Sequence, residues 1–597
     1  MKPHHAILLS ASFFSALFFG FSLTNGIDST KMIYFFAVSS AVMVSSSCSI
    51  FKVRKAPSFS VNSIDIIIII AGVSVLMRSL TISRTTFITP SLALLLYFFF
   101  RVCVSSQKNT RGMQIFLGAF LLAGILQSIV ALLQLYGLLP SLNPFFKMTG
   151  TFGNPDALAG YLTSITPFAF GIYLFTENAH LKKASAAFLS LAILIIPATM
   201  IRNSWIAISL SGIYLLYQKY HASIRNFLSP AFKKWTVVSA TIILCSLLVY
   251  GLYQLRPDSV HGRFLIWKIT AKMISAHPIL GMGFDRYGVE YGNYQADYFA
   301  NHPHNDYEIY LAGNVNHAHN DYLEITSEFG IIGLLLFSTL LFLLLKTKNP
   351  KEAKLLIPAK ASLHGIMFFM MGSFPLHILP TLINFIFIAA LISNAREPIL
   401  SLKPPPLLSK AMAILLFAAG ILLFSHTLKI YRIDKLWHHA VQGSLQQRYD
   451  EANALFVQLY PILNKNGQFL LNYGGTLSLK GDHQLAIVIL QKAGLSYTDP
   501  NIYISLGNSY ASLGKTSEAE KNFWHAYHMI PNRLYPLYLL TKLYIENNLL
   551  EKAHETGHRV IHFKEKVPSP AIVEMKAEIR ALLKKKDLFV QHPSPSS

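Results

Sequence analysis

The chain has 597 residues, of which 52% are hydrophobic and only 13% are charged, about half the charged fraction of an average soluble domain. This composition excludes a wholly soluble protein. The formal net charge is +22. Residues 431–597 carry 19 Lys and Arg against 14 Asp and Glu, a net charge of +5, so +17 belongs to the apolar part before them.

Apolar runs alternate with short polar loops from the N-terminus to about residue 430. Crossing a bilayer takes roughly 20 apolar residues, and further apolar runs follow the first one, which we therefore interpret as a span and not as a cleaved signal peptide. We predict a polytopic membrane protein of 12–13 spans. The candidates lie near 6–24, 32–51, 63–77, 88–105, 113–137, 156–176, 183–200, 203–218, 235–255, 329–346, 357–373, 379–395 and 411–428.

The basic residues gather in alternate loops, such as KVRK at 52–55 and KTKNPKEAK at 346–354, whereas the long loop 256–328 holds five basic and nine acidic residues. Loops rich in Lys and Arg stay in the cytoplasm. The N-terminus is therefore predicted inside and residues 256–328 outside. This placement explains the positive charge by topology and argues against a nucleic-acid partner.

The long loop contains one motif twice, as NHPHNDYEIY at 301–310 and NHAHNDYLEI at 316–325. In the first copy LAGN ends the helical pattern after one or two turns. The second copy runs directly into an apolar span. We therefore expect His319 to be the functional histidine, and we expect His304 to be a loop residue.

Local signals around the second copy predict a helix start. Asp321 and Glu324 have the spacing of a capping box, so His319 is expected just ahead of a helix N-terminus at the membrane surface. The free N–H groups and the positive end of the helix dipole there favour an anion. A neutral imidazole can accept a proton near neutral pH.

The C-terminal part contains an internal repeat. NYGGTLSLKGDHQLAIVILQKA aligns with SLGNSYASLGKTSEAEKNFWHA at an offset of 33 residues, and a weaker copy follows. This pattern resembles the tetratricopeptide repeat, whose helix pairs stack into a solenoid. We predict a transmembrane domain at 1–430 and an α-solenoid at 431–597. The solenoid would bind a partner or assist assembly; a purely structural appendage is the alternative.

Several motifs together resemble the family of O-antigen ligases and O-antigen polymerases, which are bacterial membrane glycosyltransferases. The resemblance covers roughly residues 110–395. Gly372 and Ser373 stand where family members often have an acidic residue. The motifs are TGTFGNPDALAGYL at 149–162, IRNSWIAI at 201–208, R-x3-W from Arg263, HPILGMG at 277–283, AHNDYLEITSEFGIIGLLLF at 318–337 and GSFPLHILPT at 372–381.

The resemblance implies an all-helical membrane bundle of the GT-C type that transfers a glycan from undecaprenyl pyrophosphate at the outer face of the bacterial inner membrane. A ligase places it on a lipid A–core sugar hydroxyl, without a metal or another cofactor. His319 would act on that hydroxyl, and Arg202 and Arg263 would bind the pyrophosphate. Asn320, His304 and Arg286 are secondary candidates.

The arginines suit that role, because guanidinium groups match phosphate oxygens with paired donors. Arg202 interrupts an apolar stretch, where an arginine at the centre of a span costs roughly 2.5–3.5 kcal/mol. It is therefore expected at an outer turn or in a polar cavity. The glycines of GMGFDRYG follow no strand, so a nucleotide site is not indicated.

Alternatives remain at this stage. Within the family, a polymerase or a protein O-oligosaccharyltransferase would use the same donor and a different acceptor. A transporter would place charges within its spans, whereas here they concentrate in loops. A membrane-anchored scaffold would work through the repeats alone. Thirteen spans would put the repeats in the periplasm together with the long loop.

Overall fold

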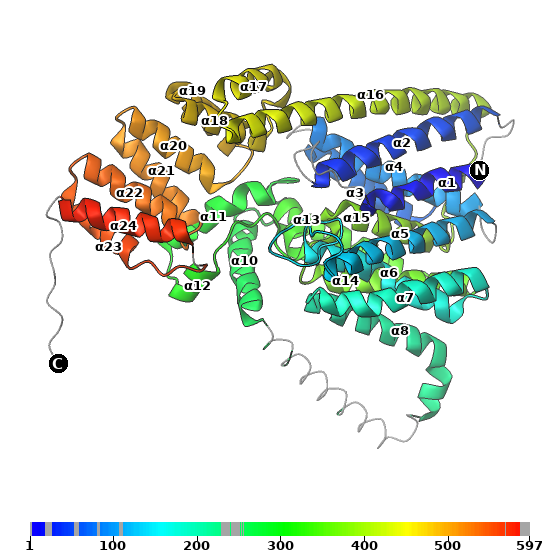
Figure 1. The fold of residues 1–597 in the computed structure, drawn as a ribbon. Coiled ribbons are helices and arrows are strands. Elements are labelled where there is room, and N and C mark those ends of the chain that lie inside the picture. The colour runs from blue at the N-terminus through cyan, green and yellow to red at the C-terminus, as the bar shows by residue number, and fades with distance from the viewer. Residues whose placement is uncertain are drawn as a thin grey trace. The chain divides into compact units, whose positions relative to one another are not determined.

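The computed structural model describes residues 3–17, 27–52, 59–79, 84–106, 111–227, 256–567 and 569–585, together with 239, 251 and 254. These residues are mostly helical, which confirms the predicted all-α polytopic fold (Figure 1). They divide into two compact units. The first contains Met1–Leu255, Ile279–Phe284 and His319–Lys435, and the second contains Arg256–Pro278, Asp285–Ala318 and Leu436–Ser597.

The first unit is the membrane bundle. In the part of the chain that the structure describes, seven helices are long and apolar enough to cross a bilayer: α2, α4–α7, α13 and α16. Its elements are α1 (Pro3–Ser10), η1 (Ala11–Leu17), α2 (Ile27–Lys52), β1 (Phe59–Val61), α3 (Ser63–Ser79), α4 (Arg84–Ser106), α5 (Arg111–Leu135), α6 (Pro155–Phe175), α7 (Ala179–Ala198), α8 (Arg202–Phe227), α13 (Asp321–Lys346), η2 (Pro350–Glu352), α14 (Ala353–Met370), η3 (Pro375–His377), α15 (Leu379–Asn394), β2 (Leu400–Leu402) and the larger part of α16 (Pro406–Leu445).

The other predicted spans within the described residues form helices that are shorter or less apolar than these seven. The stretch 63–77 forms α3, which has 17 residues. The stretches 203–218 and 357–373 form α8 and α14, which also carry lysines or arginines. Two shorter apolar helices are Ala6–Leu17 and Leu379–Asn394. The predicted span 235–255 lies almost entirely outside the described residues.

Helix α6 is the most buried of the seven, with 78% of its apolar stretch inside the protein. Glycines bring its neighbour α14 close: a Cβ on Gly160 would meet the ring of Phe369 at 2.7 Å, and one on Gly171 would meet Pro358 at 2.7 Å. Small residues allow this approach, because helices in lipid associate mainly by close packing. The start of α6, with Asp156 in its first turn, is thereby fixed in the bundle.

Charged residues also lie inside the helices, which the sequence did not lead us to expect. Arg101 of α4 and Asp65 of α3 form a buried ion pair at 3.3 Å. Asp65 also accepts hydrogen bonds from Tyr97 at 2.6 Å and from the backbone N–H of Asn62 at 2.9 Å. Strand β1 pairs with β2 in an antiparallel register, with Ser60 opposite Ser401. Because every member of this network has polar partners, it is a structural cluster and not an open ion path.

Helix α13 is broken at Gly330, which has φ 66° and ψ −167°. The segment Ile279–Phe284 lies against the break, where the N–H groups of Met282 and Gly283 donate to the carbonyls of Ser327 and Glu328, both at 2.9 Å. A Cβ on Gly330 would lie 2.1 Å from the carbonyl oxygen of Ile279. The HPILGMG and E-x-G portions of the sequence therefore meet backbone to backbone.

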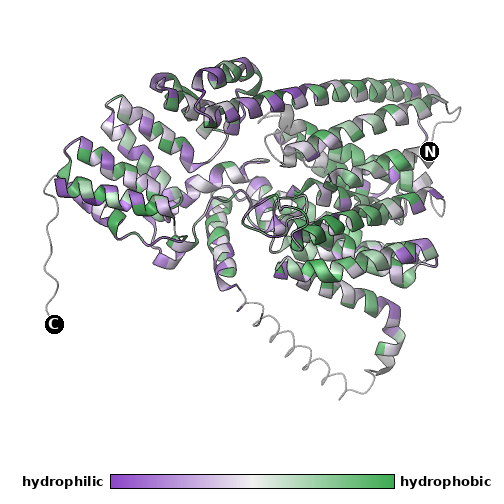
Figure 2. Ribbon diagram, in the orientation of Figure 1, coloured by the Kyte–Doolittle hydropathy of each residue, from purple (hydrophilic) through white to green (hydrophobic). Residues whose placement is uncertain are grey.

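The second unit combines two stretches that are far apart in sequence. Its loop part contains α10 (Pro257–Ala276), α11 (Tyr287–Asn301) and α12 (Asp306–Leu311). Polar and apolar residues alternate along its C-terminal helices, unlike the largely apolar helices of the bundle (Figure 2). These are α17 (Tyr449–Leu463), α18 (Gly467–Lys480), α19 (His483–Gly494), α20 (Pro500–Ser512), α21 (Thr516–Met529), α22 (Leu534–Glu546), α23 (Leu550–Ile561) and α24 (Pro570–Lys585).

Glycines that are 33 residues apart in the repeat make equivalent packing contacts in the structure. A Cβ on Gly474 would meet Leu490 at 2.6 Å, and a Cβ on Gly507 would meet Phe523 at 2.3 Å. Gly481 and Gly514 both have positive φ where α18 and α20 end. The predicted role of the small residues, close packing within successive helix pairs, is thus observed. The assignment to the tetratricopeptide class stays a prediction.

The loop helices pack directly on these repeats. The side-chain amide of Asn532 donates to the carbonyls of Ile309, Tyr310 and Ala312 at 3.0, 3.0 and 2.6 Å. The amide of Gln295 donates to the carbonyl of Met529. Residues 256–278 and 285–318 of the long loop are therefore a folded part of the second unit, and the repeats bind a segment of their own chain.

We predict that Gly330→Ala destabilises the bundle by about 1–3 kcal/mol, because alanine is strained at this positive φ and its Cβ would collide with backbone. Gly118→Ala is the matched control, since a Cβ there meets nothing within 4 Å. Thermal unfolding in detergent would measure both variants. Equal Tm values for the two would contradict the importance of the break.

Candidate active site at the start of α13

His319 lies immediately before α13 in a left-handed conformation, with φ 49°. Asn320 is the helix N-cap, and its side-chain oxygen accepts from the N–H groups of Tyr322 and Leu323 at 3.1 and 3.2 Å. Its amide nitrogen donates to the carbonyl of Met371 at 3.1 Å. These bonds hold a turn whose left-handed residue would cost roughly 1–3 kcal/mol by itself.

The predicted capping box from Asp321 to Glu324 is therefore wrong, because the cap lies one residue earlier. The first copy of the motif has the box instead. There Asn305 caps α12, its side chain accepts from the N–H of Glu308 at 2.8 Å, and Glu308 reaches back to the N–H of Asn305. The second copy has Leu323 at the matching position, so Glu324 does not take part in the cap and pairs with His377 instead.

A carboxylate faces His319. Oδ2 of Asp156 lies 3.8 Å from Nδ1 of His319, with the two side chains 10% and 32% exposed. The Ser373 hydroxyl donates to the same Oδ2 at 2.8 Å. The ring of Phe374 meets the imidazole edge to face at 5.0 Å. The start of α6 thus places a carboxylate beside His319, and the Ser373 hydroxyl holds it.

An ionic cluster of two buried carboxylates and the partly exposed His377 supports the same helix start. Nε2 of His377 lies 3.0 Å from Glu324 and 3.8 Å from Asp321. The N–H of Leu376 donates to Asp321 at 3.2 Å. Burial alone would lower the pKa of His377, but the carboxylates of Glu324, Asp321 and Glu328 outweigh it and raise this pKa to about 10. The imidazolium therefore joins η3 to the first turn of α13.

Arg202 is the first residue of α8, at a turn as predicted, and is half-buried. The next two residues fix this turn in the bundle. Asn203 donates to the carbonyl of Phe369 at 2.6 Å and lies against Gly372, and Ser204 lies 2.5 Å from Thr163 of α6. Arg202 therefore begins a helix that contacts the same 369–373 turn that holds Asn320 and Asp156.

The other predicted residues belong to the second unit. Arg263 lies in the second turn of α10, not at its start, and is half-buried. Arg286 pairs with Glu290 and donates to the carbonyl of Leu495 at 3.2 Å, so it serves the packing of loop on repeats. His304 is exposed, with Nδ1 2.8 Å from the carbonyl of His302. No role at a site follows for Arg286 or His304.

Asp156, Ser373, Phe374 and His377 were not among the predicted site residues. Signals for two of them existed: Asp156 follows Asn-Pro at a helix start inside a motif that the sequence had singled out, and His377 lies in the P-L-x-x-x-P turn at 375–380. The partner of each could not be read from one sequence, because the contacts join segments far apart in the chain.

A pH-dependent contribution to stability follows from His377. A histidine whose pKa is raised on folding stabilises the fold fully below its unfolded pKa, near 6.5, and this contribution disappears as pH rises towards the folded value of about 10. The Tm deficit of His377→Gln should thus be largest near pH 6 and shrink towards pH 10. His221→Gln, at an exposed position of α8, is the control substitution. A deficit that grows with pH would contradict the ion-pair account.

Comparison with known proteins agrees with the predicted family over part of the chain. Residues 187–338 match the family model described as O-antigen ligase. No curated protein matches the chain. The matched segment contains Arg202, Arg263 and His319, but it begins after Asp156 and ends before Ser373. This multi-pass membrane protein therefore carries a segment of the O-antigen ligase type, which supports a ligase or polymerase type of function.

Proposed function

We propose that the protein is an O-antigen ligase-type glycosyltransferase that moves a glycan from undecaprenyl pyrophosphate to a sugar hydroxyl of lipid A–core. The observation that carries the proposal is the pairing of His319 with Asp156. Nδ1 of the partly exposed imidazole lies 3.8 Å from Oδ2 of the buried carboxylate, just before the N-terminus of a membrane helix. This arrangement suits general base catalysis, in which a carboxylate orients the histidine.

In this mechanism Nδ1 of His319 faces Asp156, and Nε2 accepts the proton of the acceptor hydroxyl. The hydroxyl oxygen forms a bond to the anomeric carbon of the donor sugar. The bond from that carbon to the pyrophosphate oxygen breaks, and its electron pair leaves with the pyrophosphate. Asp156 stabilises the resulting imidazolium, and Ser373 fixes the carboxylate through its hydrogen bond at 2.8 Å.

The leaving pyrophosphate needs cations. Arg202 and Arg263 are the proposed donors, since a guanidinium offers two parallel N–H groups to phosphate oxygens. Both residues are half-buried and lie within the matched segment 187–338. No residue of this mechanism depends on a metal ion.

A polymerase or a protein O-oligosaccharyltransferase would use the same groups and a different acceptor, so these stay the alternatives within the class. The transporter is disfavoured, because the buried charges Arg101 and Asp65 are paired with each other. A scaffold would work through the repeats alone, yet those repeats are packed on their own loop.

We also propose that the loop and the repeats lie together in the periplasm, with the spans in the bacterial inner membrane. Residues 256–278, 285–318 and 436–597 form one compact unit. Parts of one folded unit cannot be separated by a bilayer. The small number of Lys and Arg in the loop, five in residues 256–328, favours the outer side.

Complementation of a deletion strain tests the chemistry. We expect His319→Ala to lower glycan transfer by about 10²–10⁴-fold, the usual contribution of a general base. Asp156→Asn keeps the shape but removes the charge, and we expect a loss of about tenfold or more in kcat. The control is Asp450→Asn, since this carboxylate is 91% exposed. Lipid-linked glycans and surface polysaccharide would both be sized on gels.

The accumulating species identifies the reaction. Long lipid-linked chains without transfer to lipid A–core indicate a ligase, and chains that stop at one repeat unit indicate a polymerase. A His319→Ala strain with unchanged glycans would refute the proposed chemistry.

Cysteine labelling tests the shared side of loop and repeats. In a background without native cysteines, Ser275→Cys and Ser512→Cys should react with an impermeant maleimide in intact spheroplasts. Lys348→Cys, in the basic loop 346–354, should react only after permeabilisation. All three positions are exposed. Labelling of Ser275→Cys without Ser512→Cys in intact spheroplasts would contradict the shared location.

A further inference from the structure

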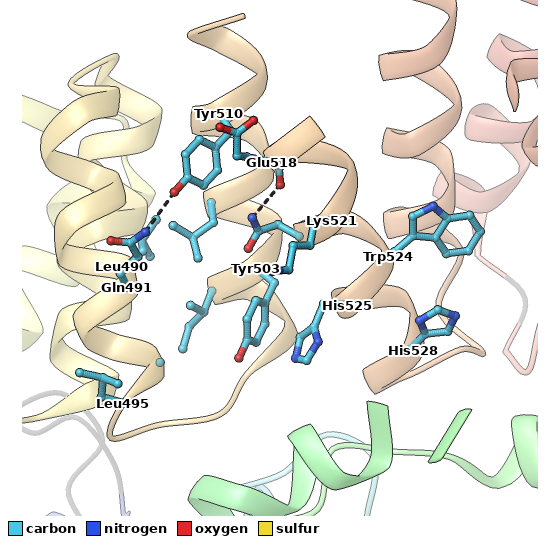
Figure 3. Close-up of a pocket in the computed structure, with 14 residues that line it drawn as sticks. Leu490, Gln491, Leu495, Tyr503, Tyr510, Glu518, Lys521, Trp524, His525 and His528 are labelled. Carbon is cyan, nitrogen blue, oxygen red and sulfur yellow. Dashed lines mark hydrogen bonds between the residues drawn. The ribbon is translucent and has the colours of Figure 1, made fainter. Parts of the chain in front are cut away.

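A groove of about 710 Å³ opens between helices α19, α20 and α21 of the repeats (Figure 3). Its volume is within the range of about 300–1,000 Å³ that is usual for small-molecule sites. Gln491 and Tyr510 are joined by a hydrogen bond of 3.0 Å on one side of it. Tyr503 and His525 lie together at its base, with ring centroids 4.1 Å apart.

The lining combines aromatic rings with neutral polar groups. Tyr503, Tyr510 and Trp524 provide the rings, and Gln491 and Asn522 provide amides. The face of an aromatic ring is electron-rich and attracts C–H groups of slight positive charge. One face of a pyranose ring presents such C–H groups, while its hydroxyls both donate and accept. An amide offers two donors and an acceptor, which matches those hydroxyls.

The groove carries no strong net charge. Glu518 and Lys521 contribute one charge of each sign. Burial, aided by His528 and Lys521, lowers the pKa of His525 to about 4, and burial with nearby Arg559 lowers the pKa of His528. Both imidazoles are therefore neutral near pH 7. This balance disfavours nucleic acid and strongly acidic or basic peptides.

The base of the groove continues into the folded loop. The Tyr503 hydroxyl donates to Oδ1 of Asn293 in α11 at 3.1 Å, and Nε2 of His525 lies 3.1 Å from the same oxygen. The carbonyl of Leu495, at the edge of the groove, accepts a hydrogen bond from Arg286. A ligand in the groove would thus be held by the unit that also contains Arg263.

We propose that this groove binds a stretch of neutral oligosaccharide and so retains a glycan chain on the protein. The inference rests on the proposed function, which supplies glycans at this location, and it assigns the repeats a substrate in place of a protein partner. The glycan has two possible sources, the donor polysaccharide and the acceptor core oligosaccharide. The chemistry of recognition is the same for both, so the experiment separates them.

The test uses the full chain in detergent and isothermal titration calorimetry. The probes are the O-polysaccharide and the core oligosaccharide released by mild acid from lipopolysaccharide of the bacterium that carries the gene. Dextran is the control glycan. The groove variant is Gln491→Ala with Asn522→Ala. Its matched control is Gln468→Ala with Asn472→Ala on α18, which does not line the groove.

We expect one of the two probes to bind, and the groove variant to bind it about tenfold more weakly. Two neutral hydrogen bonds of roughly 0.7 kcal/mol each would give that factor. The matched control should bind like the wild type. In transfer assays the groove variant should raise KM for the bound glycan and leave kcat unchanged.

Three outcomes would decide against the groove: no binding of either probe by the wild type, equal binding of dextran, or equal affinity of the groove variant and its control. The fate of His319→Ala separates this proposal from the proposed function. If that variant is inactive and the groove variant binds normally, the groove fails and the transferase stands. If His319→Ala transfers glycan normally, the proposed function fails.

Discussion

A membrane helix can be interrupted only where other groups take up its backbone hydrogen bonds, since each unsatisfied group in lipid costs several kcal/mol. Helix α13 meets this condition at Gly330, where Met282 and Gly283 bind the carbonyls of Ser327 and Glu328. The side chain of Arg78 also donates to the carbonyl of Glu328, at 2.8 Å. The break makes the first turns of α13 a separate short helix with its own anchors. His319 lies two residues before that short helix, so its position depends on the interruption.

One connection, residues 371–377 between α14 and α15, holds that short helix and the carboxylate beside it. Asn320 binds the carbonyl of Met371, Ser373 binds Asp156, and His377 binds Glu324. Each contact includes a polar or charged group that would be costly to bury alone. Together they fix the imidazole of His319 against a carboxylate while leaving it 32% exposed. A held ring with part of its surface exposed is compatible with the proposed role of His319 as a base.

Features that depend on local sequence were predictable. The all-α membrane bundle followed from apolar runs, and the close packing at Gly474 and Gly507 followed from the 33-residue offset. The capping box was misplaced by one residue, because Asn and Asp are both good N-caps and stand side by side in N-D-Y. The pairing of His319 with Asp156 was not predictable, since it depends on how α6 and α13 meet in the bundle. The same holds for the buried pair of Arg101 and Asp65.

The folded loop occupies part of the surface of the repeats. Sequence patterns treat 256–328 as a connection and 431–597 as a separate module. In the structure, Asn532 and Gln295 join them through backbone carbonyls, which are present whatever the side chains are. Such contacts recognise a shape that only a folded loop has. The surface that an external partner would use is thereby partly occupied by the chain itself, and the groove beside Tyr503 and His525 stays open. This open groove is the place for which we propose a glycan ligand.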